Sequence, residues 1–211
     1  MSAPNPAASL QFIENRTYTE ISVGDSAQTV RTLTPHDISL FAVMSGDVNP
    51  AHVDADYAKT DMFHSIIAHG MWGAALISAV LGTQLPGPGA IILDQSLSFK
   101  APIALGDTII ARVEVSEKLE KGRVTLAFTC INQDGVTVID GTARVIAPAD
   151  KVRCPRAVLP DVELHVPAAQ YARLIAATTD LTPVRTAVVH PCDELSLTEA
   201  LDAAERGIIV P

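Results

Sequence analysis

The hydrophobic pattern of the chain changes its period near residue 90. Before that point the longest apolar run is SIIAHGMWGAALISAVLG, residues 65–82, which carries His69, two serines and three glycines. A membrane-spanning helix needs about 20 consecutive apolar residues. This run is shorter and is interrupted by polar residues, so it predicts a helix buried at the centre of a soluble domain.

Beyond residue 90 apolar and polar residues alternate, which is typical of β-strands. Four segments show this pattern: residues 91–102, 107–119, 122–135 and 136–148. The sequences KG and QDG fall at hairpin positions and predict that at least three of these strands run antiparallel. One buried helix followed by an antiparallel sheet that can wrap it predicts an α+β domain ending near Pro148.

Local signals mark two further helices before the long apolar run. Thr34, Pro35 and Asp37 form a helix start signal, with Thr34 as N-cap and Pro35 at the first helical position. Gly46 can end that helix in the left-handed conformation. Asp54 can either cap a short helix over DADYAKT or act as a partner of His52.

The flanking segments predict the domain boundaries. Residues 1–13 are expected to be a flexible N-terminus, and the domain proper spans residues 14–148. Residues 149–170 are rich in proline and charge and predict a linker. Residues 171–211 predict a helix, a buried strand and an amphipathic helix with Ser196 as N-cap, which together make part of a second domain.

Composition narrows the possible partners. The 211-residue chain has a formal net charge of −9 at pH 7, which argues against nucleic acid because binding that polyanion relies on a basic surface. Its three cysteines are widely spaced and form no CxxC pattern, so they predict reduced thiols in a cytoplasmic protein. The N-terminal residues lack a basic region followed by an apolar core, which predicts no secretory signal, and no membrane partner is expected.

The candidate chemistry lies in SGDVNPAHVD, residues 45–54, where Asp47 and His52 are five residues apart across an Asn-Pro bend. Taken singly, Asp47 is typical of a solvated residue after a helix end, and His52 of an ordinary loop histidine. The full spacing, together with AHGM at residues 68–71, is specific enough to predict a catalytic pair instead.

These two segments and QSLSFKAPIALGDT, residues 95–108, resemble the MaoC-like, (R)-specific enoyl-CoA hydratases. The resemblance covers roughly residues 14–148 and implies the hot-dog fold, in which a long central helix is wrapped by an antiparallel sheet. It implies the reversible syn hydration of a trans-2-enoyl-CoA to an (R)-3-hydroxyacyl-CoA. Asp47 and His52 would activate water, and the Gly70 N–H would polarise the thioester carbonyl.

The resemblance also implies substrate contacts. Ser78 and Leu81 match positions near the active site or along the acyl pocket, and with Asn49 they are the expected substrate-binding residues. Asn49 can equally serve as scaffold, because its side chain can bond its own backbone and hold the bend.

The chemistry itself has three requirements. Hydration of a C=C bond conjugated to a thioester needs a base for water, an acid for the α-carbon and donors for the enolate oxygen. Gly70 lies in the first turn of the apolar helix, so its N–H is unpaired within the helix and sits at the positive end of the dipole. The missing side chain would let a carbonyl approach closely.

Two other functions stay open. A hot-dog acyl-CoA thioesterase would use Asp47 to direct water at the carbonyl, although thioesterases of this fold typically lack the complete motif. A non-catalytic acyl-CoA-binding or assembly module would use no chemistry, and the intact Asp47/His52 pair argues against it.

No cofactor is expected, because coenzyme A is part of the substrate. No metal is expected either, because the spacing of Asp47, His52, His64 and His69 matches no HExxH-type ligand pattern. Basic residues on or near the strands could contact the CoA phosphates, although isolated basic residues at strand ends are usually only solvated: Lys100, Arg112, Lys118, Lys121 and Arg123. In the hydratase family two units pair to form each site, which implies a homodimer or a dimer-based higher oligomer.

Residues 171–211 resemble the opening of phosphate acetyl/butyryltransferases, and fusions of these two activities are a known architecture. The resemblance implies a truncated start of the transferase. One strand and one helix cannot build that site, so no phosphotransacetylase activity is expected of this chain.

Overall fold

The computed structural model describes residues 12–164, 167–189 and 192–210, and the chain divides into two compact units, Met1–Asp161 and Val162–Pro211. Most of the predicted flexible N-terminus, residues 1–11, lies outside the described residues. None of the described helices combines the length and apolar character that crossing a membrane requires.

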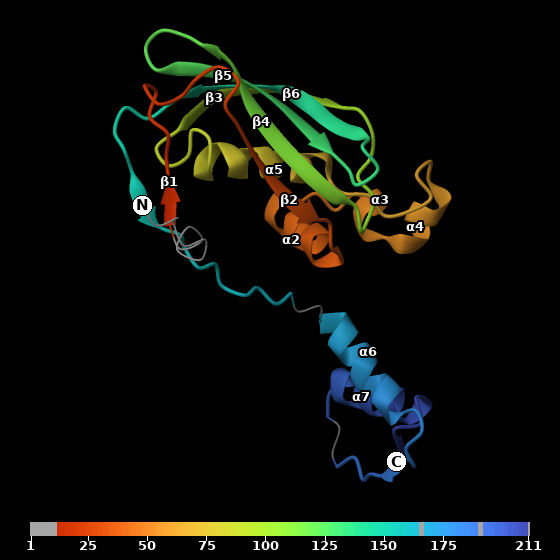
Figure 1. Cartoon of the computed structure of the whole chain (residues 1–211). Helices are drawn as coiled ribbons and strands as arrows, with labels where there is room; N and C mark the ends of the chain where they lie inside the picture. The colour runs from red at the N-terminus through yellow and green to blue at the C-terminus, as the bar shows by residue number, and fades with distance from the viewer. Residues whose placement is uncertain (1–11, 165–166, 190–191, 211) are drawn as a thin grey trace, which may run out of the picture. The chain divides into compact units, whose positions relative to one another are not determined.

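A five-stranded sheet forms the framework of the first unit (Figure 1). Each neighbouring pair is antiparallel, and the strand order is β2-β4-β5-β6-β3. The strands are β2 (Ser26–Thr32), β3 (Ile91–Phe99), β4 (Thr108–Lys118), β5 (Arg123–Ile131) and β6 (Thr137–Ile146). Buried and exposed positions alternate along β4, as expected where one face of a sheet is covered. The predicted antiparallel meander is therefore confirmed.

Helix α5 (Gly70–Thr83) lies along the covered face of this sheet (Figure 1). Ile77, Val80 and Leu81 have no exposed surface and join the core with the inward side chains of the strands. Each such side chain contributes about 1.5–3 kcal/mol relative to an exposed one. The α+β class, with a buried helix wrapped by an antiparallel sheet, is as the sequence predicts.

Helix α2 (Pro35–Ser45) begins and ends at the predicted residues. The Asp37 N–H donates to Thr34 Oγ1 over 3.2 Å, and the Thr34 N–H donates to the Asp37 carboxylate over 3.0 Å, which completes a capping box. Burial alone would raise the pKa of Asp37, but hydrogen bonds from Thr34 and Arg31 outweigh it and hold that pKa below its usual value. Gly46 ends the helix at φ 75°.

The first unit extends beyond Pro148, where the sequence predicts the domain to end. β7 (Arg153–Pro155) pairs with β1 (Phe12–Glu14), so the first residues of the predicted linker belong to this unit. Buried Asn15 holds the pairing: its Nδ2 donates to the Asp150 carbonyl over 2.9 Å, and its Oδ1 accepts from the Val152 N–H over 2.9 Å. These contacts join residues more than 130 positions apart, beyond the reach of local sequence patterns.

The second unit contains α6 (Pro167–Thr178), β8 (Val184–Arg185), α7 (Glu194–Glu205) and β9 (Ile209–Val210). β8 and β9 pair in parallel. The prediction of Ser196 as N-cap of α7 is wrong, because the helix begins earlier. Asp193 is the cap, and its carboxylate accepts from the Ser196 N–H over 2.8 Å and from the Ser196 hydroxyl over 2.8 Å.

The packing of β6 predicts a large effect for one glycine. A Cβ at Gly141 would overlap the Ser96 carbonyl oxygen and lie 2.7 Å from the Phe128 ring. Gly141→Ala should therefore destabilise the fold by about 3 kcal/mol. Urea unfolding followed by the fluorescence of Trp72, the only tryptophan, measures this in the first unit.

Gly82→Ala is the matched control, because nothing lies within 4 Å of a Cβ at this position in α5. It should stabilise the protein by about 0.5–1 kcal/mol, since alanine is the better helix former. Equal stability of the two variants would contradict the strand packing described here.

Candidate active site

Short-range hydrogen bonds shape the loop that carries Asp47. The loop starts where Gly46 ends α2, and Asp47 Oδ1 accepts from the Asn49 N–H over 3.2 Å. Asn49 in turn caps α3 (Pro50–Val53), since its Oδ1 accepts from the Ala51 N–H over 3.1 Å. The structure thus places Asn49 as scaffold of the bend, with its side chain engaged in the cap.

His52 comes from α3 and is half-buried. Its Nδ1 lies 2.9 Å from the carbonyl oxygen of Ile67. A carbonyl only accepts hydrogen bonds, so Nδ1 carries the proton and donates it. The neutral ring therefore keeps a bare lone pair on Nε2, which makes that nitrogen the basic atom of the ring.

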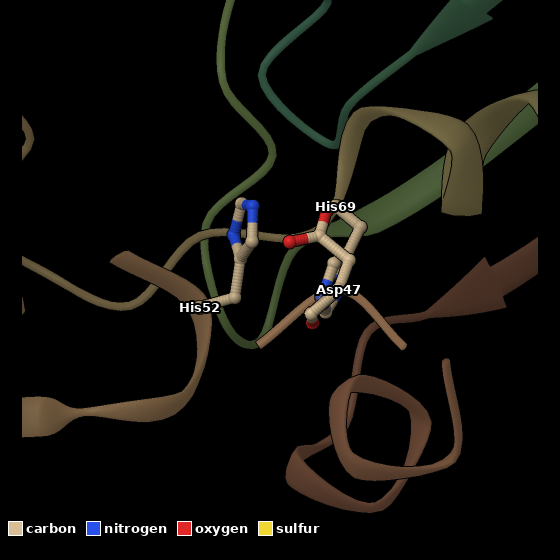
Figure 2. A group of neighbouring side chains, drawn as sticks. All are labelled: Asp47, His52 and His69. Atoms are coloured by element: carbon tan, nitrogen blue, oxygen red, sulfur yellow. The ribbon is translucent and has the colours of Figure 1, made fainter. Parts of the chain in front are cut away.

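The structure brings Asp47 and His52 together, as Figure 2 shows. A carboxylate oxygen of Asp47 and a ring nitrogen of His52 lie within 4.8 Å of each other, and the carboxylate points toward the imidazole. Two hydrogen bonds of about 2.8 Å can bridge groups separated by up to about 5.6 Å. One water molecule can therefore contact both residues.

Gly70 is the first residue of α5, and its N–H has no hydrogen-bond partner among the described residues. It shares the N-terminal, positive end of a 14-residue helix. A Cβ at Gly70 would lie 3.0 Å from the Phe99 ring, so the missing side chain makes room for Phe99. The sequence instead predicts that this space admits an approaching carbonyl.

His52 and Gly70 line the same cavity, whose volume of about 320 Å³ is within the size range of ligand pockets. We call it the His52 cavity. Its walls are mostly apolar and come from four separate parts of the chain. The lining residues are His52, Phe63, Ile67, Ala68, Gly70, Phe99, Lys100, Ala101, Pro102, Ile103 and Ile139.

Ser78 and Leu81 lie elsewhere on α5. Among the described residues, neither is part of the lining of the His52 cavity. Ser78 is exposed, about 12 Å along the helix from Gly70 at 1.5 Å per residue. Leu81 has no exposed surface and belongs to the core. Their roles in substrate binding stay predictions.

His69 contacts both Asp47 and His52, whereas the sequence suggests it only as a candidate metal ligand. Its ring is 2% exposed, and its Nε2 lies 3.0 Å from the Asp47 carbonyl oxygen. The ring centroids of His69 and His52 are 4.1 Å apart. AHGM was recognised as a helix start, but no local pattern shows that its histidine contacts a loop 22 residues away.

Asp47, His52 and His69 are also residue types that bind zinc, and one ligand atom from each lies within 4.8 Å of the others. The Nε2 of His69 is engaged with the Asp47 carbonyl, so Nδ1 is its remaining ligand atom. The expectation that this site needs no metal stays a prediction.

The five candidate CoA-binding cations differ in their surroundings. Lys100 lines the His52 cavity, and its Nζ lies 3.3 Å from Asp140. Lys118 is engaged with the fold, because its Nζ donates to the carbonyls of Tyr18 and Ile21. Arg112 pairs with Glu114, and Arg123 is exposed. Lys121 lines a different cavity, which Tyr18 and Pro148 also line.

Residues 19–133 match the family model described as a MaoC like domain. The chain is 52% identical over 133 residues to an (R)-specific enoyl-CoA hydratase from Rhodospirillum rubrum, which covers 63% of this chain and 92% of that protein. A solved R-hydratase structure from Pseudomonas aeruginosa, in the unliganded form, is 45% identical, with a TM-score of 0.71. That match covers 73% of this chain and 99% of the other.

A stretch of 42 residues is 55% identical to a phosphate acetyltransferase from Rhizobium meliloti. It covers 20% of this chain and 13% of that protein. The second resemblance is thus supported over a short stretch.

Proposed function

This chain belongs to the family of MaoC-like domains, and on that premise we propose that it hydrates trans-2-enoyl-CoA reversibly to (R)-3-hydroxyacyl-CoA. The observation that carries the proposal is the placement of three groups at one site. Asp47 and a ring nitrogen of His52 are within reach of one water, and Gly70, whose N–H is unpartnered among the described residues, lines the same cavity as His52. The relatives named as (R)-specific hydratases support the same reaction.

In the proposed mechanism, His52 Nε2 takes a proton from the water held between it and Asp47. The hydroxyl forms a bond to C3, and the electrons of the C2=C3 bond move to the thioester oxygen. The Gly70 N–H and the positive end of α5 stabilise that enolate oxygen. Asp47 orients the water and balances the charge on His52.

The second half of the reaction returns the proton. His52 gives the proton it took to C2, the enolate electrons form the new C–H bond, and the thioester carbonyl is restored. Hydroxyl and proton come from one water held on one side of the substrate, so both add to the same face. Addition from one face yields a single hand at C3, and the reverse sequence is the dehydration.

We place the protein in the cytoplasm. Cys130, Cys154 and Cys192 are all free, which fits a reducing environment. Coenzyme A enters only as the carrier of the substrate.

The mechanism predicts the effect of two substitutions on the hydration of crotonyl-CoA, followed by loss of the enoyl thioester's ultraviolet absorbance. Asp47→Asn and His52→Gln should each lower kcat by about 10²–10⁴-fold, the range that a positioned acid or base contributes. Asp56→Asn is the control and should keep wild-type activity. Asp56 is exposed and pairs with Lys59 in the same helix, α4 (Ala55–Thr60).

The same assay separates the alternatives. An (R) product from wild type supports the hydratase. Release of free CoA thiol without loss of the double bond would show a thioesterase, and binding without either signal would show a non-catalytic module.

Lys100 is the cation that we place against a phosphate of the CoA carrier, because it alone among the five candidates lines the His52 cavity. Lys100→Gln should raise KM by about 5-fold and leave kcat unchanged, the size expected from a half-exposed ion pair of about 1 kcal/mol. Lys121→Gln is compared in parallel. A larger rise in KM for that variant would place the carrier over the other cavity instead.

A second copy of the chain completes the assembly in this proposal. Among the described residues β3 is an edge strand that pairs with β6 alone, and it exposes Ile91, Leu93 and Phe99 at 57%, 45% and 56%. Gln95 Nε2, in the same strand, is buried with no hydrogen-bond partner among the described residues. A long apolar edge strand is prone to pair with another chain, so β3 is where a partner copy would add its own edge.

Leu93→Lys should therefore shift the protein from dimer to monomer in size-exclusion chromatography with light scattering. Val30→Lys is the matched control, because Val30 is 56% exposed on β2, the opposite edge of the same sheet. A dimer that survives Leu93→Lys and is lost with Val30→Lys would place the interface at the other edge.

A further inference from the structure

His69 contacts Asp47 and His52 and directly precedes Gly70 in the chain. Its ring lies against His52, its Nε2 bonds the backbone of Asp47, and Gly70 follows it in the chain. Unlike Asp47, which is exposed, His69 is almost fully buried, and among the described residues it is not part of the lining of the His52 cavity. Its burial therefore keeps it from facing the space where a substrate would bind, although it contacts the groups of the site.

The hydrogen bond to Asp47 fixes the tautomer of His69. The Asp47 carbonyl can only accept, so Nε2 carries the proton and donates it over 3.0 Å. This is the opposite tautomer to that of His52, whose proton is on Nδ1. The bond holds the backbone of Asp47 against the start of α5, and the direction of its carboxylate follows from that backbone.

The two histidines form a reciprocal link between two segments. His52 in the loop donates to the carbonyl of Ile67, and His69, two residues further on, donates back to the carbonyl of Asp47. The rings are 4.1 Å apart and tilted by 37°, and Phe41 lies on His69 at 4.9 Å. The His52 ring is thus held at one nitrogen and along one face, which leaves Nε2 in a fixed direction.

Two features of His69 lower the stability of the fold relative to a residue that satisfies all its hydrogen bonds. It occupies the N-cap of α5 but makes no capping hydrogen bond through its side chain, unlike Thr34 at the start of α2. Its Nδ1 is buried with no partner among the described residues, and a buried unsatisfied acceptor costs stability. A polar residue that breaks these rules is expected where function requires it.

We propose that His69 is a positioning residue, which fixes the Asp47 carboxylate and the His52 ring relative to the Gly70 N–H. This role rests on the proposed hydration reaction. His69 acts through Asp47 and His52 and forms no bond with the substrate. Small misplacements of reacting groups cost large factors in rate, so its loss should appear in kcat.

Two variants separate the hydrogen bond from the ring. His69→Phe keeps the ring and removes the donor to Asp47, and it also removes the unsatisfied Nδ1. We expect kcat for crotonyl-CoA to fall on the order of 10–100-fold, with KM changed by less than about 3-fold and the melting temperature preserved. His69→Gln carries an amide N–H at the same distance along the side chain as Nε2, and should recover at least half of that loss on a logarithmic scale.

The matched control is His36→Phe. His36 is an exposed histidine in the first turn of α2, and its substitution should leave kcat and KM at wild-type values. A lower melting temperature for His69→Phe with unchanged kcat per folded molecule would overturn the proposal, because that is what a purely structural role produces. Equal losses in His69→Phe and His69→Gln would also overturn the part assigned to the hydrogen bond.

Nitrogen-15 NMR of the histidine rings gives a readout that does not depend on turnover. Wild type should show His69 protonated on Nε2 and His52 protonated on Nδ1, and the His52 pattern should persist in His69→Phe, because the Ile67 carbonyl still accepts from Nδ1. Wild-type protein with His69 protonated on Nδ1 would contradict the hydrogen bond to Asp47 and overturn the proposal. Wild-type protein with this pattern but without hydration would overturn the proposed function and not the geometry, so the two failures are distinguishable.

Discussion

The burial of α5 against the sheet is the constraint on which the geometry of the site depends. The helix cannot slide or rotate freely, because its core face is fully buried. Gly73 also lies against Ile139, and a Cβ at Gly73 would be only 2.5 Å from the Ile139 side chain. Its first residue is held in the same way, by the ring of Phe99 beside Gly70. A free N–H at the positive end of a helix is useful to chemistry only if it stays in one place, and packing along the whole helix provides that.

The loop at residues 45–54 is mostly exposed, and two hydrogen bonds join it to the segment that leads into the helix. Asp47 is exposed, His52 is half-buried, and the buried histidine is the one that comes from the helix side. Side chain to backbone bonds from His52 and His69 cross the gap in opposite directions. The hot-dog framework thus fixes the Gly70 N–H at the start of α5, and the two histidines hold the loop that carries Asp47 beside it.

Features that depend on neighbours in sequence could be predicted. The capping box of Thr34 and Asp37, the left-handed Gly46 and the alternation along the strands are all local, and each is present in the structure. The pairing of Asp47 with His52 could be predicted for a similar reason, because both lie on one ten-residue motif. Ser196 shows the limit even of local rules, since Asp193 three residues earlier is also a good cap and the helix uses it.

Features that depend on distant contacts could not be predicted in this way. Asn15 bonds to Asp150 and Val152, so the end of the first unit is decided by a partner at the other end of the domain. The contact of His69 with Asp47 spans 22 residues and has no periodic signature. Phe99 has the pattern of an ordinary strand residue, and only the folded structure shows that its ring lies beside Gly70.

Different parts of the fold supply the candidate chemical groups and the walls of the His52 cavity. The groups assigned to the chemistry come from one loop and one helix start, so a short motif can identify the reaction. The walls of the His52 cavity come from segments near residues 63–70, 99–103 and 139, and their distances are set by tertiary packing. Leu81, expected along the acyl pocket, is part of the core that fixes this packing. Under the proposed function, acyl-chain preference therefore depends on how the sheet and α5 pack, and substitutions that change it need not touch the motif at residues 45–54.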